Sequence, residues 1–184
     1  MTEEQFNYAM QRVRKKDKSG LREIYEAYVG FIYNVVLSVI KDSTAAEDIT
    51  SEFFIRLWEK ADQFKEGNGH KGYMATIARN MTIDYIRKNS REDLLPEDEE
   101  DREIAEQGIN TGDNTPTPEN QVIEELSVKE ALERLKPLYK QIVTMKVLGD
   151  MTFKEISEAL NIPMGTVTWD YRDAIKQLRR FGYE

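Results

Sequence analysis

The 184-residue sequence contains no cysteine and a single histidine, His70. The lack of cysteine excludes disulfide bonds and thiolate chemistry, and one histidine leaves little for a zinc site. The longest apolar-rich stretch, VGFIYNVVLSVI, is too short and too polar to cross a bilayer. The first residues, MTEEQFNYAM, lack the basic start and apolar centre of a signal peptide. We therefore expect a soluble, cytoplasmic protein without membrane insertion.

Residue patterns that support catalysis are also scarce. Neither a nucleophile–base pair nor a phosphate-binding loop is visible. The one conceivable metal cluster would combine Asp42, Glu47, Asp48 and Glu52 with His70. Asp42 precedes the expected helix, and these acids are better explained as cap, surface and partner contacts. We therefore expect neither an enzyme nor a bound cofactor.

The net charge of −8 is unevenly distributed along the chain. Residues 1–90 hold 14 Lys/Arg and 13 Asp/Glu, residues 91–125 hold 2 and 13, and residues 126–184 hold 10 and 8. The three parts therefore carry +1, −11 and +2. Because the acidity lies in the middle, the total charge does not argue against nucleic-acid binding by the flanking parts.

Apolar periodicity fails only in the middle segment, which also holds three of the five prolines. Its high charge and few apolar residues cannot offset the entropy lost on ordering. We predict a flexible acidic linker over residues 91–125. It joins two small helical domains over residues 1–90 and 126–184.

Apolar residues in the first domain recur with the period of a helix, and no β-alternation of any length is present. Stripes of this kind cover residues 21–39, 49–58 and about 73–88. They predict an all-α bundle, with an additional helix around residues 3–16.

The second of these helices is rich in aromatic residues. Thr44 and Glu47 form a candidate capping box at its start. Phe53, Phe54 and Trp58 follow within six residues. A narrow stripe cannot bury all three, and an exposed aromatic suits a protein contact. The alternative is that they fill the core.

The second domain contains a helix-turn-helix pattern. Thr152 and Glu155 form a capping box, and Asn161 is a C-cap candidate that tolerates left-handed geometry. Small Ser157 lies where the two helices must approach, and Pro163 is placed to start the second helix. In such a motif the second helix enters the major groove of DNA. The residues expected to contact DNA are Gly165, Thr166, Thr168, Trp169, Arg172, Lys176 and Arg179.

Three strings together carry a family resemblance: DSTAAEDITSEFFIRLWEKADQF, YMATIARNMTIDYIRKNSR and, after ALERL, TFKEISEALNIPMGTVTWDYRDAIKQL. They resemble a group-four sigma factor of the extracytoplasmic-function type, the promoter-recognition subunit of bacterial RNA polymerase. The resemblance covers about residues 5–90 and 126–181. IARN-x-x-x-D-x-x-R joined to a C-terminal GTV helix-turn-helix is a specific combination.

The resemblance implies core RNA polymerase, promoter DNA and an anti-sigma factor as partners. In the family, the second helix docks on the clamp helices of the polymerase. The matching positions are Asp48, Glu52, Phe53, Arg56 and Trp58.

The resemblance also implies two promoter contacts. In the family, the third helix and the loop before it engage the minus-ten element and hold a flipped base, and the helix-turn-helix reads the minus-thirty-five element. Residues 68–71 match the base pocket. The minus-ten set as a whole is Asn68, His70, Lys71, Tyr73, Arg79, Asn80, Asp84, Arg87 and Lys88.

The sequence departs from the family pattern in three places. Tyr73 stands where tryptophan is usual. Thr168, Trp169 and Asp170 stand where a basic or small polar run is common. Asp170 would face phosphate unfavourably unless it accepts a hydrogen bond from cytosine or pairs with a cation. The linker is also more acidic than a spacer requires.

Distance constrains the linker. Two promoter elements two helical turns apart are separated by roughly 70 Å. A flexible coil of this length spans about 30–35 Å, and a fully extended one about 110 Å. The linker therefore bridges the elements only when stretched. The resemblance suggests that it threads the polymerase channel that later holds RNA, and our hypothesis is that residues 92–106 act there as an RNA mimic.

Two other functions are compatible with helical domains. A stand-alone helix-turn-helix regulator would act without polymerase, usually as a dimer on a palindrome. The aromatic second helix and the absence of a ligand-pocket signature count against it. A helical regulator that binds a sigma factor would make no DNA contact.

Overall fold

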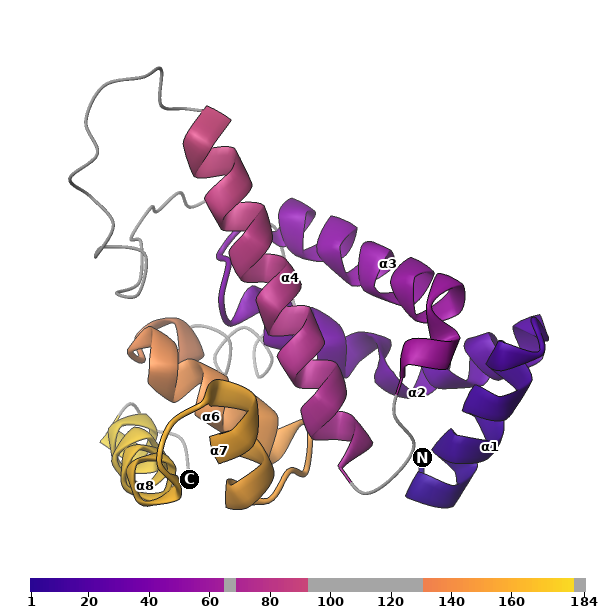
Figure 1. Ribbon diagram of the computed structural model, residues 1–184. Helices are drawn as coiled ribbons and strands as arrows, with labels where there is room; N and C mark the ends of the chain where they lie inside the picture. The colour runs from indigo at the N-terminus through magenta and orange to yellow at the C-terminus, as the bar shows by residue number, and fades with distance from the viewer. Residues whose placement is uncertain (65–68, 93–130, 181–184) are drawn as a thin grey trace, which may run out of the picture.

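The computed structural model describes residues 1–64, 69–92 and 131–180. Within these ranges every regular element is helical, as predicted. The linker prediction for residues 91–125, with the RNA-mimic hypothesis, falls almost wholly outside the described residues. None of the described helices is long and apolar enough to span a membrane. The first group of elements is α1 (Glu3–Arg14), α2 (Lys18–Leu37), α3 (Ser43–Glu59), the 3-10 turn η1 (Ala61–Gln63) and α4 (His70–Glu92); the second is α6 (Pro137–Val147), α7 (Phe153–Leu160) and α8 (Met164–Arg180) (Figure 1).

Helices α1 and α2 form an antiparallel pair. The side chain of Thr2 accepts a hydrogen bond from the backbone N–H of Gln5, and the Gln5 side chain accepts one from Thr2, which completes a capping box for α1. Gly20 of α2 lies at the closest approach, since a Cβ atom there would come within 2.5 Å of the Ala9 carbonyl oxygen. Any larger residue would push the two helices apart.

Helix α3 begins earlier than the sequence predicted. Asp42 is the N-cap, and its carboxylate accepts hydrogen bonds from the backbone N–H groups of Thr44 (2.8 Å) and Ala45 (3.2 Å). The predicted capping box of Thr44 and Glu47 is therefore wrong. One carboxylate satisfies two free N–H groups of the first turn, which leaves Thr44 no capping role.

The helix-turn-helix forms as predicted. Thr152 and Glu155 build the capping box of α7, with a 2.8 Å bond from the Thr152 N–H to the Glu155 carboxylate. Asn161 ends this helix with φ 55° and ψ 44°, in the left-handed region. The hydroxyl of Ser157 donates to the Ile162 carbonyl at 2.6 Å, which ties the turn to α7.

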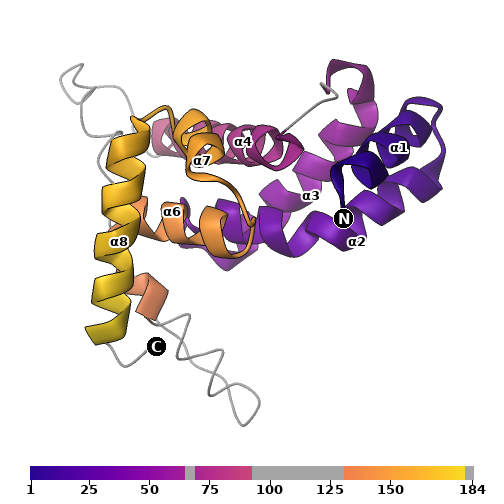
Figure 2. The ribbon, with the colours of Figure 1, turned by 90° about the horizontal axis from the view of Figure 1, so that it is seen from below.

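The two domains share one continuous core. Met74, Ala75 and Ala78 on the inner face of α4 belong to the same buried cluster as Met151 and Ile156 of the helix-turn-helix domain. Figure 2 shows α7 alongside α4, and α6 beside α2. Helix α4 therefore packs against α2 and α3 of its own domain and against α7 of the other, and α2 and α6 form a second contact between the domains.

Candidate nucleic-acid and partner interfaces

Helix α3 presents a polar outer ridge. The α3 outer ridge consists of Asp48, Glu52, Ile55 and Glu59, spaced by three or four residues and all exposed. Ile55 is 50% exposed, although it is a large apolar side chain. The sequence prediction missed it, but a signal was present because Ile55 does not fit the inward stripe of this helix. Arg56 is exposed beside the ridge.

Phe53 does not belong to this surface. Its side chain is 0% exposed and its ring meets those of Phe54 and Phe64 at centroid distances of 5.2 and 6.4 Å. The prediction that Phe53 contacts a partner is therefore wrong. Helix α3 packs against both α2 and α4, so its buried arc is wide enough to take in two of the three aromatics.

Trp58, the third aromatic, is half-buried at the edge of an apolar groove between α2 and α3. The ammonium group of Lys16 lies 5.1 Å from the centroid of its ring and donates to its carbonyl at 2.9 Å. Tyr25 is 46% exposed on the opposite wall. The groove encloses about 350 Å³ and is lined by Lys18, Leu21, Arg22, Tyr25, Phe54 and Trp58.

Helix α4 also has an outer ridge, opposite its buried face. The α4 outer ridge consists of Tyr73, Ile77, Asn80, Asp84 and Arg87, at intervals of three and four residues. Of these, Asn80, Asp84 and Arg87 are exposed, as is the neighbouring Lys88. The structure thus brings together five of the predicted minus-ten residues: Tyr73, Asn80, Asp84, Arg87 and Lys88.

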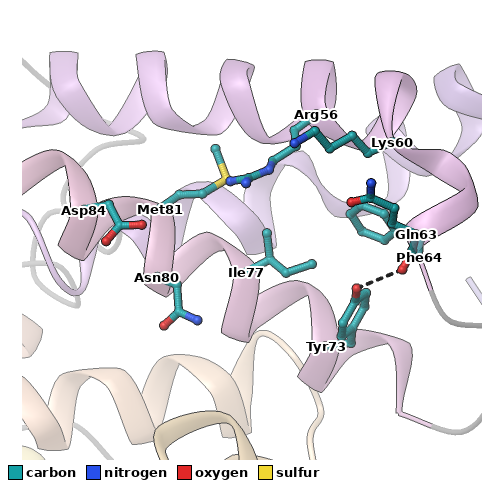
Figure 3. Close-up of a pocket in the computed structure, with 9 residues that line it drawn as sticks. All are labelled: Arg56, Lys60, Gln63, Phe64, Tyr73, Ile77, Asn80, Met81 and Asp84. Atoms are coloured by element: carbon teal, nitrogen blue, oxygen red, sulfur yellow. Dashed lines mark hydrogen bonds between the residues drawn. The ribbon is translucent and has the colours of Figure 1, made fainter.

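A pocket opens where this ridge meets the end of α3. The α3–α4 pocket encloses about 270 Å³. In its wall, the Tyr73 hydroxyl donates to the Gln63 carbonyl at 3.2 Å, and the Tyr73 ring meets Phe64 edge-on at 5.3 Å. Phe64 is buried, so Tyr73 is the aromatic that keeps some exposure. Figure 3 shows the lining residues: Arg56, Lys60, Gln63, Phe64, Tyr73, Ile77, Asn80, Met81 and Asp84.

The other predicted minus-ten residues lie elsewhere. Asn68 falls outside the described residues, and Lys71 is half-buried on the inner side of α4. Arg79 is half-buried and donates from Nε to the Gln141 side chain of α6 at 3.2 Å, and burial lowers the pKa of its guanidinium. His70 is helical and buried, with 7% exposure, although the sequence placed it in an open base-binding loop.

His70 is held by stacking and by one hydrogen bond. Its ring lies 4.3 Å from that of Phe6, nearly parallel, and its Nε2 is 2.6 Å from the hydroxyl of Tyr28. Burial, followed by the charge of Lys71, lowers the pKa of His70 from 6.5 to about 4; the nearby Glu155 opposes this shift, and the N-terminal amine adds to it.

This environment predicts a loss of stability in mild acid. The folded protein holds His70 neutral, whereas the unfolded chain takes up a proton below pH 6.5. The contribution of neutral His70 to the stability of the fold is therefore complete above pH 6.5 and is lost as the pH falls towards 4. The free energy of unfolding, measured with urea, should be about 2 kcal/mol lower at pH 5 than at pH 7 because of His70. His70→Gln should remove this part of the pH dependence. Equal pH slopes for the two proteins would contradict the assignment.

Helix α8 has the most sharply divided faces. Its inward side holds the buried Val167, Asp170 and Ala174. At 100° per residue, the directly opposite side is the α8 outer ridge, which consists of Gly165, Trp169, Arg172 and Lys176, all exposed. Thr166 and Arg179 are exposed at its margins, whereas Thr168 is half-buried and donates to the Met164 carbonyl at 2.9 Å.

The two acids of α8 point away from this ridge. Asp170 is 6% exposed, and burial together with the neighbouring Asp173 raises the pKa of its carboxyl. Asp173 accepts hydrogen bonds from the Tyr139 hydroxyl at 3.1 Å and from the Gln177 amide at 2.9 Å. The expected conflict between Asp170 and a phosphate therefore does not arise, because α8 packs this residue inward.

Comparison with known proteins finds two regions of one protein family in this chain. A family model of sigma-70 region 2 matches residues 24–92, and one of sigma-70 region 4 matches residues 125–178. The solved structure of the sigma factor RpoE, crystallised with the anti-sigma factor NepR from Bartonella quintana, has the same fold; the TM-score is 0.63 at 17% identity, over 87% of this chain and 94% of that one.

Curated relatives extend the similarity over most of the sequence. The chain is 24% identical over 183 residues to the ECF RNA polymerase sigma factor SigK of Mycobacterium tuberculosis, covering 92% of this chain and 89% of the relative. It is 30% identical over 166 residues to the ECF RNA polymerase sigma factor SigW of Bacillus subtilis, covering 86% of each. This protein therefore belongs to the ECF sigma factors of RNA polymerase.

Proposed function

We propose that this sigma factor directs RNA polymerase to promoters through three separate surfaces. The α3 outer ridge binds the polymerase, the α4 outer ridge with the α3–α4 pocket binds the minus-ten element, and the α8 outer ridge binds the minus-thirty-five element. One observation carries the assignment: each ridge lies opposite the buried face of its helix, so contact with a partner leaves the core intact. A protein with this role is a promoter-recognition subunit and not itself an enzyme.

The two alternatives account for less of the molecule. A stand-alone regulator needs the helix-turn-helix but has no use for region 2, and a regulator of a sigma factor has no use for a cationic α8 ridge. Regions 2 and 4 are both present in this chain, so neither alternative function is supported.

The minus-ten contact centres on the pocket. Extruding a base from the stack costs a few kcal/mol, which stacking and hydrogen bonds in a pocket must offset. Tyr73 supplies a ring, and the amide of Asn80 can both donate and accept. Arg56 and Lys60 at the rim can neutralise flanking phosphates. The volume of the pocket, about 270 Å³, suits a single base. Sites for drug-sized ligands are slightly larger, with volumes of about 300–1,000 Å³.

The minus-thirty-five contact uses the helix-turn-helix. Residues near the start of α8 lie where such motifs meet base edges, and Arg172, Lys176 and Arg179 lie farther along, where phosphates run. Both domains are close to electrically neutral, at +1 and +2. The free protein therefore binds DNA weakly, and the polymerase supplies most of the phosphate contacts.

We also propose an anti-sigma partner and a cytoplasmic location. NepR binds the structural relative RpoE in its crystal. The groove beside Trp58, with its apolar floor and its two cations Lys18 and Arg22, supports a protein partner for this chain. RNA polymerase acts on DNA in the bacterial cytoplasm, which sets where this subunit must work.

Ile55→Arg is the variant that tests the polymerase surface. A buried Ile contributes about 1.5–3 kcal/mol, so its loss should weaken binding to core polymerase by roughly tenfold or more. Fluorescence titration with core polymerase measures the affinity, and transcription from a genomic library measures initiation. The exposed Glu4→Arg on α1 is the matched control. Wild-type affinity in Ile55→Arg would remove the α3 outer ridge from the proposal.

A further inference from the structure

We propose that Trp169 recognises the 5-methyl group of a thymine in the minus-thirty-five element. This inference rests on the proposed role of α8 and adds the identity of one base to it. The side chain is 63% exposed on the α8 outer ridge, in the N-terminal half of the helix.

The surroundings of Trp169 are open towards the outside. Gly165 lies one turn earlier on the same ridge, and nothing lies within 4 Å of the place a Cβ would occupy there. Met164, at the start of the helix, is 54% exposed. The leading end of α8 therefore offers a large apolar side chain beside a gap in which the backbone can approach DNA closely.

The chemistry of indole limits what Trp169 can recognise. An indole has one N–H donor and no acceptor. It cannot form the paired hydrogen bonds by which Arg reads guanine and Asn or Gln reads adenine. The apolar group on the floor of the major groove is the thymine methyl, and removing both surfaces from water is favourable.

The charges around Trp169 favour DNA over a protein as the occupant. Farther along the same ridge lie Arg172 and Lys176, while Asp170 and Asp173 are turned inward. The exposed side of α8 is therefore cationic with an apolar tip, which complements phosphates flanking a methyl group. The ridge also continues the helix-turn-helix surface of the region 4 match, residues 125–178.

The first test selects promoters from a pool with a randomised minus-thirty-five region. The full-length chain with bacterial core polymerase transcribes the pool, and the transcribed templates are sequenced. The wild-type protein should select thymine at one position. Trp169→Ala should lose the preference there and keep the preferences at the other positions. Selection of another base at every position affected by Trp169→Ala would overturn the inference.

The second test removes only the methyl group. Deoxyuridine replaces the selected thymine, which should lower wild-type transcription about fourfold and leave Trp169→Ala unchanged. Trp169→Phe, which keeps an apolar ring, should retain part of the sensitivity. Arg172→Ala should lower transcription from both templates alike. A wild-type protein indifferent to deoxyuridine would overturn the inference even if Trp169→Ala were inactive, because Trp169 would then act through a protein contact or through folding. Failure of the wild-type protein to initiate on any template would instead refute the proposed function.

Discussion

A disulfide between cysteines introduced by Gly72→Cys and Glu155→Cys is expected to reduce promoter-directed transcription to background. The Cβ position at Gly72 of α4 lies 3.5 Å from the Cβ of Glu155 in α7. Disulfides join Cβ atoms that are about 3.5–4.5 Å apart. Because the natural chain has no cysteine, the two introduced thiols have no other partner within the molecule.

The physical reason is the distance between the two proposed DNA-binding surfaces. Helices α4 and α7 are in contact, so the α4 and α8 outer ridges belong to one compact body (Figure 2). Promoter elements two helical turns apart are separated by roughly 70 Å. The domains must therefore separate before both elements are bound, and separation also frees Arg79 from Gln141.

Transcription with core polymerase is measured under oxidising conditions and again after reduction, with the cross-link verified by mass spectrometry. Reduction should restore activity. Each single-cysteine variant should stay active in both conditions, although loss of the Glu155 cap costs about 1 kcal/mol in the second domain. Full initiation by the oxidised, cross-linked protein would show that the packed arrangement itself is competent.

Tyr73→Ala is expected to lower promoter opening by roughly 5- to 150-fold, the equivalent of one lost base–aromatic stack of about 1–3 kcal/mol. Asn80→Ala should act in the same direction through the lost amide. Asn80 is exposed, so its replacement leaves the core intact. Tyr73 is half-buried, and its ring packs against Phe64 at the edge of the core.

Opening is followed by the fluorescence of 2-aminopurine placed within the minus-ten element, with polymerase bound. Tyr73→Phe is the matched control, because it keeps the ring and removes only the hydroxyl that donates to the Gln63 carbonyl. On a template that is already unpaired in the minus-ten element, the difference in opening between the wild type and Tyr73→Ala should be smaller. Part of the cost of flipping the base has then already been met. Equal opening by Tyr73→Ala and wild type on duplex DNA would place the flipped base outside the α3–α4 pocket.

Features governed by neighbouring residues could be predicted from the sequence. The capping box of Thr152 and Glu155 spans three residues, and the left-handed cap at Asn161 depends on its own side chain. The cationic positions of the α8 outer ridge, Arg172 and Lys176, follow from the helical period alone. Such features need only the local chain, so no knowledge of distant contacts is required.

Features governed by contacts between distant parts of the chain could not be predicted from the sequence. His70 and Arg79 look like loop or surface residues in the sequence, and for Phe53 the sequence left both a partner contact and core filling open. Phe53 and His70 are buried and Arg79 is half-buried, by contacts with other helices. Ile55 is the converse case, an apolar residue that no helix covers.

The sequence by itself determined the helices, the helix-turn-helix and the uneven charge, because hydrophobic period, caps and composition act over a few residues. The tertiary structure alone decided which candidate residues of each helix remain exposed. It buried Phe53 between neighbouring helices, turned Asp170 inward and formed the pocket that Tyr73 lines. It also packed α7 against α4, because apolar faces that a sequence shows one at a time are removed from water only when they meet.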